Sequence, residues 1–169
     1  MLCFIPLPTG RAIPHEVYSN LAMQTIDLNI MPCVTNGVLK RIGNTKKVQC
    51  EINSRNMIWQ ILKMLDDYNH KFVAIQDSDI IHLNDANYEL CINFLNLHED
   101  FVGVALPQNP ASHLKHQACV FHTDFMREYI WNDKFKPQHI CPNLAYDVRL
   151  MGKKYEYFPS AAPMIKEMR

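Results

Sequence analysis

The sequence has no excess of charge of either sign, since 17 lysines and arginines balance 17 aspartates and glutamates. A domain that binds nucleic acid normally carries a basic excess, because much of its affinity comes from contacts with phosphates. The balance therefore argues against a nucleic-acid partner. The sequence also lacks an apolar run of about 18 residues, the length that a helix needs to cross a bilayer. We expect no transmembrane segment.

Closely spaced cysteine pairs are missing as well, and we expect no signal peptide. The apolar N-terminus is too short for a signal peptide, and Pro6 and Pro8 interrupt it. The cysteines contain no Cys-x-x-Cys pair, and several lie in apolar runs, which is typical of buried, reduced thiols. They are Cys3, Cys33, Cys50, Cys91, Cys119 and Cys141. Together these features predict a cytoplasmic protein.

What the chain does contain is an alternation of two periodicities. Its 169 residues suffice for one domain with a single substantial core. Short apolar runs alternate with segments of helical spacing, which predicts an α/β fold with a mainly parallel sheet flanked by helices. The predicted strands are 2–7, 29–34, 72–75, 101–106, 116–121 and 155–158. The predicted helices are 15–24, 54–65, 84–97, 124–131 and 142–151, and 40–47 is predicted to be a loop.

Two carboxylates, Asp77 and Asp79, follow the predicted strand 72–75 with one residue between them. In an extended chain alternate side chains share a face, so the two would converge. Converging carboxylates repel each other unless a cation or hydrogen bonds stabilise them, and Mg²⁺ or Mn²⁺ with a diphosphate co-ligand would do so. Ligands of open α/β sheets bind beyond the carboxyl ends of the strands. The alternative is an ordinary polar turn whose side chains cap the next segment.

Five landmarks, taken in order, resemble the GT-A fold and, within it, the family 2 glycosyltransferases. They are residues 5–11, 24–37, 53–56, 72–79 and 144–159. The resemblance implies one GT-A-like, Rossmann-like domain over 1–169. Residues 1–110 or so would form its nucleotide-sugar-binding half and about 111–169 a short acceptor-side half. It implies a glycosyltransferase that uses Mn²⁺ or Mg²⁺ to move a sugar from a UDP- or GDP-type nucleoside-diphosphate sugar to an acceptor that the sequence does not identify.

The resemblance also implies roles for single residues. Asp79 would bind the metal, and Asp77 the metal or the ribose. The nucleotide would be bound by Pro6, Thr9, Arg11, Asn36 and Arg55. An arginine suits a diphosphate because its guanidinium pairs with phosphate in bidentate geometry. Arg55 fits equally well as a solvated residue in the first turn of a helix.

One part of the family pattern is missing. Inverting members usually carry an acidic pair just before the last helix, and its aspartate takes the proton of the acceptor hydroxyl. This sequence has Ile140-Cys141 at that place. Asp147 is the nearest candidate for the general base, with Asp124 and Asp133 behind it. Asp147 also fits a solvated helix charge beside Arg149.

Three functional interpretations therefore stay open. The first is a metal-dependent glycosyltransferase. The second is a catalytically inactive nucleotide-sugar-binding or scaffold protein that retains the GT-A core. The third is a nucleotidyltransferase, which would need a glycine-rich loop after the first strand, where only Gly10 is found. Because the chain ends soon after the last core strand, we expect an acceptor site that is minimal, completed by a homo-oligomeric partner, or lost.

A histidine-rich stretch offers a different metal chemistry. His113, His116, Cys119 and His122 recur at every third residue, and all are side chains that bind transition metals. On a strand this spacing distributes them over both faces, which disfavours a zinc site. An alternative role for His122 is to face the acceptor pocket.

Overall fold

The computed structural model describes residues 1–8, 10–35, 39–41, 48–50, 65–67, 69–108, 117–131 and 146–168. The strands are β1 (Leu2–Pro8), β2 (Asn29–Thr35), β3 (Leu39–Arg41), β4 (Val48–Cys50), β5 (Phe72–Gln76), β6 (Ile80–His82), β7 (Phe101–Ala105), β8 (Ala118–His122), β9 (Lys154–Tyr157) and β10 (Ile165–Glu167). The helices are α1 (His15–Ala22), α3 (Asn87–Leu97) and α4 (Thr123–Trp131). Residues 65–67 and 146–150 are also helical.

Six of the strands form the central sheet, in the order β2-β1-β5-β8-β7-β9. Strand β1 is parallel to β2 and to β5, and β7 is parallel to β9, whereas β8 is antiparallel to both of its neighbours. The predicted α/β fold with a mainly parallel sheet is confirmed. Strand β5, which leads to Asp77, lies in the middle of the sheet.

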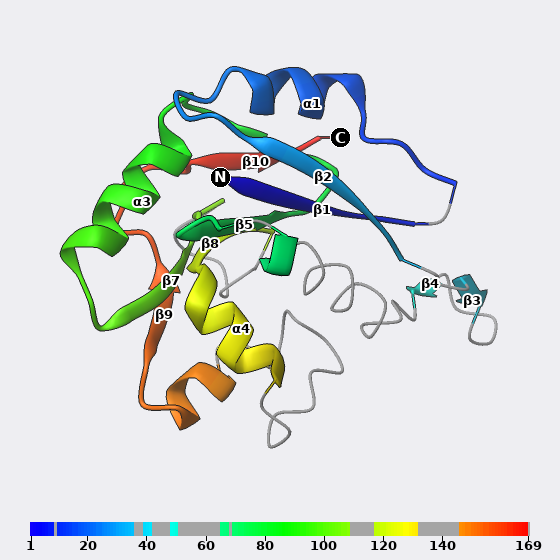
Figure 1. Ribbon diagram of the computed structural model, residues 1–169. Coiled ribbons are helices and arrows are strands. Elements are labelled where there is room, and N and C mark those ends of the chain that lie inside the picture. The colour runs from blue at the N-terminus through cyan, green and yellow to red at the C-terminus, as the bar shows by residue number, and fades with distance from the viewer. Residues whose placement is uncertain are drawn as a thin grey trace.

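Both faces of the sheet are covered, so the molecule has two cores (Figure 1). Along β1, Leu2 and Phe4 pack on the face of α4, whereas Cys3 and Ile5 pack on the face of α1 and α3. This alternation follows from the two-residue period of a strand. Because neither face meets water, the strands read as continuous apolar runs. The four described cysteine side chains, at positions 3, 33, 91 and 119, are buried in the two cores, as predicted.

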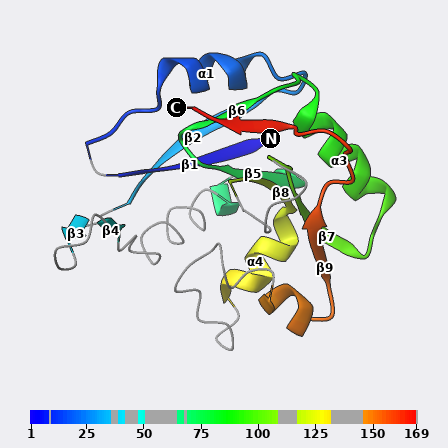
Figure 2. The same ribbon diagram turned by 180° about the vertical axis from the view of Figure 1, so that it is seen from behind.

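Several predicted boundaries and one predicted loop need correction. Helix α1 ends two residues before the predicted end, and α3 begins three residues after the predicted start. The predicted loop 40–47 is wrong at its beginning, because β3 and β4 pair as antiparallel strands. Most of the predicted helix 54–65 lies outside the described residues. The sequence pattern also gave no sign of β6 and β10, which pair with each other beside the main sheet (Figure 2).

Gly103 in β7 is required by close packing. A methyl group at this position would lie 2.2 Å from the Phe121 ring and 2.8 Å from the Val120 carbonyl oxygen. The ring could turn aside, but the carbonyl belongs to the neighbouring strand β8, which would have to shift.

We therefore expect Gly103→Ala to lower the free energy of unfolding by about 1–3 kcal/mol, the range for overpacked cores. Urea denaturation measures this change. Phe121→Leu in the same chain should recover part of the loss, because it removes the nearest ring atoms. If Gly103→Ala has the same free energy of unfolding as the wild type, β8 shifts without a measurable loss of stability.

Candidate functional site

The carboxyl ends of three parallel strands meet at one edge of the sheet. Strands β1 and β2 end at Pro8 and Thr35, which are paired with each other. Phe4 of β1 pairs with Ile75 of β5, so Pro6 comes level with Asp77, the residue after β5. The reversed strand β8 begins at the same edge, with Ala118 opposite Gln76. This is the edge at which open α/β sheets bind ligands.

Residues 77–79 form a turn at this edge. The Asp77 N–H donates to the Gln117 carbonyl at 2.7 Å, and the Ile80 N–H donates back to the Asp77 carbonyl at 3.3 Å. Contrary to the expectation from the sequence, the chain is therefore not extended across these two residues, because it turns here to enter β6. The charge of Asp79 nevertheless acts on Asp77. The two aspartates also follow a central strand, as predicted. Asp77 is half-buried and Asp79 is exposed.

A third carboxylate, which the sequence analysis missed, acts on the same turn. Burial, together with the negative charges of Asp79 and Glu167, raises the pKa of Asp77 to about 7. Glu167 belongs to β10, where it pairs with Ile80, and the next N–H, of Met168, donates to the Asp79 carbonyl at 2.7 Å. The C-terminal strand thus brings a further acidic group to the Asp77–Asp79 turn.

Gln117 completes the surroundings of the three carboxylates. Its Nε2 donates to Glu167 Oε1 at 3.0 Å. Its Oε1 is buried and has no hydrogen-bond partner within the part of the chain that the structure describes. Buried acceptors of this kind are uncommon in folded proteins and call for an explanation. A buried oxygen without a partner among the described residues, on a side chain that binds Glu167, suits a metal ion or a ligand hydroxyl.

The structure describes two of the other predicted nucleotide-binding residues, Pro6 and Arg11. Pro6 is half-buried at the ligand-binding edge. Arg11 is exposed in the segment between β1 and α1. Thr9, Asn36 and Arg55 lie outside the described residues, so their roles stay predictions.

Asp147, the predicted general base, lies on the helical segment 146–150 and is half-buried. The Tyr129 hydroxyl donates to its Oδ2 at 2.7 Å. Burial raises the pKa of Tyr129, and the bond to Asp147 raises it further, so the phenol stays a donor. Asp147 is therefore a half-buried, hydrogen-bonded carboxylate rather than a freely solvated charge. Asp133 lies outside the described residues.

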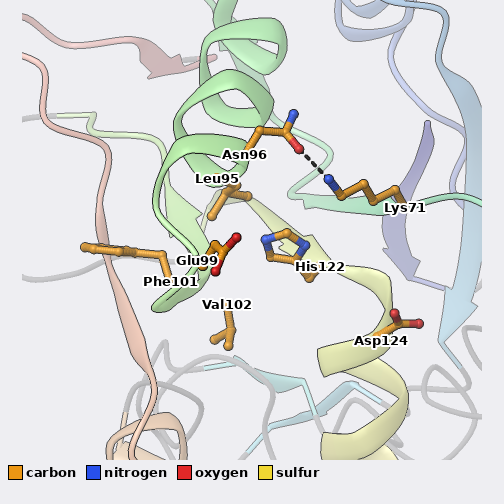
Figure 3. Close-up of a pocket in the computed structure, with 8 residues that line it drawn as sticks. All are labelled: Lys71, Leu95, Asn96, Glu99, Phe101, Val102, His122 and Asp124. Carbon is orange, nitrogen blue, oxygen red and sulfur yellow. Dashed lines mark hydrogen bonds between the residues drawn. The ribbon is translucent and has the colours of Figure 1, made fainter.

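A separate cavity of about 340 Å³ lies at the opposite edge of the sheet (Figure 3). Lys71, His122 and Asp124 line it, and His122 pairs with Phe72 at the start of β5. The five residues of β5, at about 3.3 Å each, separate this cavity from Asp77. His122 therefore lies at the other end of β5 from Asp77, which argues against the suggested place in the acceptor pocket. Asp124 is likewise remote, and it pairs with Arg127 at 3.3 Å.

The described residues of the histidine-rich stretch do not bring their metal-binding side chains together. The Cys119 side chain packs in the core on the α4 face, with Sγ donating to the Ile75 carbonyl at 3.5 Å. His122, three residues along the same strand, points to the other face, where its cavity also includes Leu95. His113 and His116 lie outside the described residues.

A buried histidine stands behind the Asp77–Asp79 turn. His82 is 3% exposed, and its Nε2 lies 2.7 Å from Gln76 Oε1. Its Nδ1 lies 3.2 Å from the Asn87 amide nitrogen, a donor, so the proton is on Nε2. Burial lowers the pKa of His82 from 6.5 to about 3.

This histidine should make the protein sensitive to acid. Its folded-state pKa is depressed, so below pH 6.5 the unfolded chain binds a proton that the folded chain does not. Because of His82, the free energy of unfolding then falls by up to about 1.4 kcal/mol for each unit by which the pH drops. We expect the stability difference between wild type and His82→Gln, measured by urea denaturation, to shrink between about pH 7 and about pH 5. A constant difference would contradict the assignment.

Comparisons with known proteins bear on the fold. No protein-family model matches the sequence, and no curated protein matches it. The mannosyltransferase PcManGT from Pyrobaculum calidifontis, solved with GDP-Man and Mn²⁺, has a TM-score of 0.65 at 12% identity, covering 94% of this chain and 55% of its own. S. aureus TarS has a TM-score of 0.61 at 14% identity, covering 99% and 36%. A cytidylyltransferase from Leptospira borgpetersenii has a TM-score of 0.60 at 11% identity, covering 95% and 76%.

The chain has the GT-A fold. At these identities the likeness establishes the fold and not the reaction. The chain spans about half the length of the mannosyltransferase and about a third of TarS. None of the described helices is both long and apolar enough to span a bilayer.

Proposed function

We propose that this GT-A domain transfers a sugar from a UDP- or GDP-type nucleoside-diphosphate sugar to an acceptor, with Mn²⁺ or Mg²⁺ held at Asp77 and Asp79. One observation carries the proposal: at the ligand-binding edge of the sheet, the negative charges of Asp79 and Glu167 both act on the half-buried Asp77 carboxyl. Ionised together and unpaired, the three carboxylates would repel each other. A divalent cation brought by a diphosphate would remove that repulsion.

The side chains at this edge have the right chemistry for such an ion. Asp77, Asp79, Glu167 and Gln117 offer oxygen atoms, the donors that Mg²⁺ and Mn²⁺ prefer. No three acidic, histidine or cysteine side chains among the described residues are already spaced to hold a metal. Mg²⁺ usually takes only one or two carboxylates and completes its shell with water and substrate phosphates. Asp77 and Asp79 fit that mode of binding.

Each group would have a defined part in the transfer. A bound divalent ion supplies a Lewis acid for the leaving diphosphate. Asp77 and Asp79 would hold the donor through that ion, and Pro6 and Arg11, with Thr9, Asn36 and Arg55, would line the nucleotide. Gln117 Oε1, which has no partner among the described residues, would accept a hydrogen bond from a hydroxyl group of the nucleotide sugar. Asp147 would take the proton of the acceptor hydroxyl.

A thermal-shift panel tests the donor half of the proposal. Ligands that bind only the folded state raise the unfolding temperature by mass action. UDP-, GDP-, CMP- and dTDP-sugars are compared with and without Mn²⁺. We expect UDP- or GDP-sugars to raise the temperature only when Mn²⁺ is present. Equal shifts without the metal, or no shift with any nucleotide sugar, would contradict the proposal.

A binding or scaffold protein without transfer activity is the second candidate. The observation in its favour is that the position of the family's usual base holds no carboxylate, while Asp147 already accepts a hydrogen bond from Tyr129. Mn²⁺-dependent nucleotide-sugar binding without turnover, over a broad panel of acceptors, would favour it.

A nucleotidyltransferase is the third candidate, because the cytidylyltransferase structure is nearly as similar as those of the two glycosyltransferases. Incubation with nucleoside triphosphates and sugar phosphates, followed by a pyrophosphate assay, separates the two reactions. Pyrophosphate release would favour nucleotidyl transfer over sugar transfer.

A further inference from the structure

Four buried polar side chains form a connected set directly behind the Asp77–Asp79 turn. We call Gln76, His82, Asn87 and Tyr88 the Gln76 network; each is at most 3% exposed. The Gln76 Oε1 accepts from the Tyr88 hydroxyl and from His82 Nε2, both at 2.7 Å. The Asn87 amide reaches His82 Nδ1 at 3.2 Å. Both acceptor sites of the Gln76 oxygen are thus filled by matching donors.

The Gln76 network reaches the turn from two sides. On the near side, Gln76 Nε2 donates to the Ile80 carbonyl at 3.0 Å, so one side chain spans residues 77–79. On the far side, Asn87 Nδ2 donates to the Met164 carbonyl at 2.6 Å, just before β10. Strand β10 then runs beside β6 and carries Glu167. The network therefore joins the turn to the strand that bears the third carboxylate.

Apolar side chains of the same shape would fill this space without the free-energy cost of a buried polar group left unpaired. Buried polar groups cost free energy unless every one is paired, and a fully paired network fixes one arrangement of its members. Side chains behind a metal site commonly orient its ligands, and their loss weakens binding. The Gln76 network has this position relative to Asp77, Asp79 and Glu167.

We infer that Gln76 is a positioning residue, which holds the Asp77–Asp79 turn and the Glu167 strand in the arrangement that receives a divalent cation. The inference rests on the proposed function for the identity of the cation. The hydrogen bonds that hold the turn involve no metal, so they are tested in the absence of metal.

The experiment compares Gln76→Leu and Tyr88→Phe with Cys91→Ala. Leucine at 76 removes every bond of the amide, whereas phenylalanine at 88 removes only one donor to it. Cys91 is buried in the same core on α3 and serves as the matched control for lost packing. The first readout is hydrogen exchange of the Ile80 amide without metal. The second is the affinity for Mn²⁺ in the presence of GDP or UDP, measured by calorimetry.

Gln76→Leu should weaken Mn²⁺ binding by ~10-fold or more, the scale for groups that orient metal ligands. It should also speed exchange at Ile80, because the side chain that spans the turn is lost. Tyr88→Phe should change both in the same direction by less, and it serves alone if Gln76→Leu does not fold. Cys91→Ala should lower the unfolding temperature and leave both readouts unchanged.

The inference is overturned if either readout in the two network variants equals that in Cys91→Ala. A wild type that does not bind Mn²⁺ would contradict the proposed function instead. The exchange data would then still decide whether Gln76 holds the turn.

Discussion

Replacing Asp79 by alanine is expected to abolish Mn²⁺-dependent nucleotide binding and to leave the fold intact. Loss of a direct metal ligand should exceed the ~10–100-fold effect typical of groups behind a ligand. The fold should persist because Asp79 is exposed and its carbonyl, which accepts from the Met168 N–H, is unchanged. Calorimetry of GDP and UDP with Mn²⁺ measures the affinity.

The same variant makes a prediction for the protein without metal. The charge of Asp79 is one cause of the raised pKa of Asp77, after burial. A raised carboxyl pKa means that the fold disfavours the ionised form, so removing Asp79 should leave metal-free stability unchanged or slightly higher near neutral pH. Asp85→Ala is the control, because it removes an equal charge from an exposed site that does not act on Asp77. Unchanged affinity in Asp79→Ala, with Mn²⁺ present, would refute the metal assignment.

The central sheet could be predicted because the pattern that indicates each strand lies within a few consecutive residues. Each buried strand is a run of apolar residues, and the run 72–75 followed by Asp77 places a polar group at a strand end. That information lies within ten residues of sequence. The reversal of β8 is different, because apolar runs of parallel and antiparallel buried strands read alike. Only the pairing of Ala118 with Gln76 reveals it.

The unpredicted parts of the site depend on contacts between distant residues. Glu167 lies 90 residues from Asp77 in the numbering, and three-residue strands such as β6 and β10 carry too little periodicity to be found. Gln117 looks like any polar residue before a strand until its partner Glu167 is known. Gln76 was the detectable exception, since a polar residue ended an otherwise apolar buried run.

The second large effect concerns catalysis. If the protein transfers sugar with inversion, Asp147→Asn should lower turnover by ~10²-fold or more, the usual scale for the loss of a general base. Donor affinity should not change, because Asp147 belongs to the predicted acceptor half. Initial rates at saturating donor, together with calorimetric donor affinity, separate the two effects.

Two companion variants make this test specific. Asp124→Asn should transfer sugar at the wild-type rate, because Asp124 lies at the far edge of the sheet and pairs with Arg127. Tyr129→Phe removes the hydroxyl that donates to Asp147 Oδ2 and leaves the carboxylate in place. Because the carboxylate is retained, turnover in Tyr129→Phe should fall by less than in Asp147→Asn. Wild-type turnover in Asp147→Asn would assign the proton transfer to another group, to a partner chain, or to a retaining mechanism.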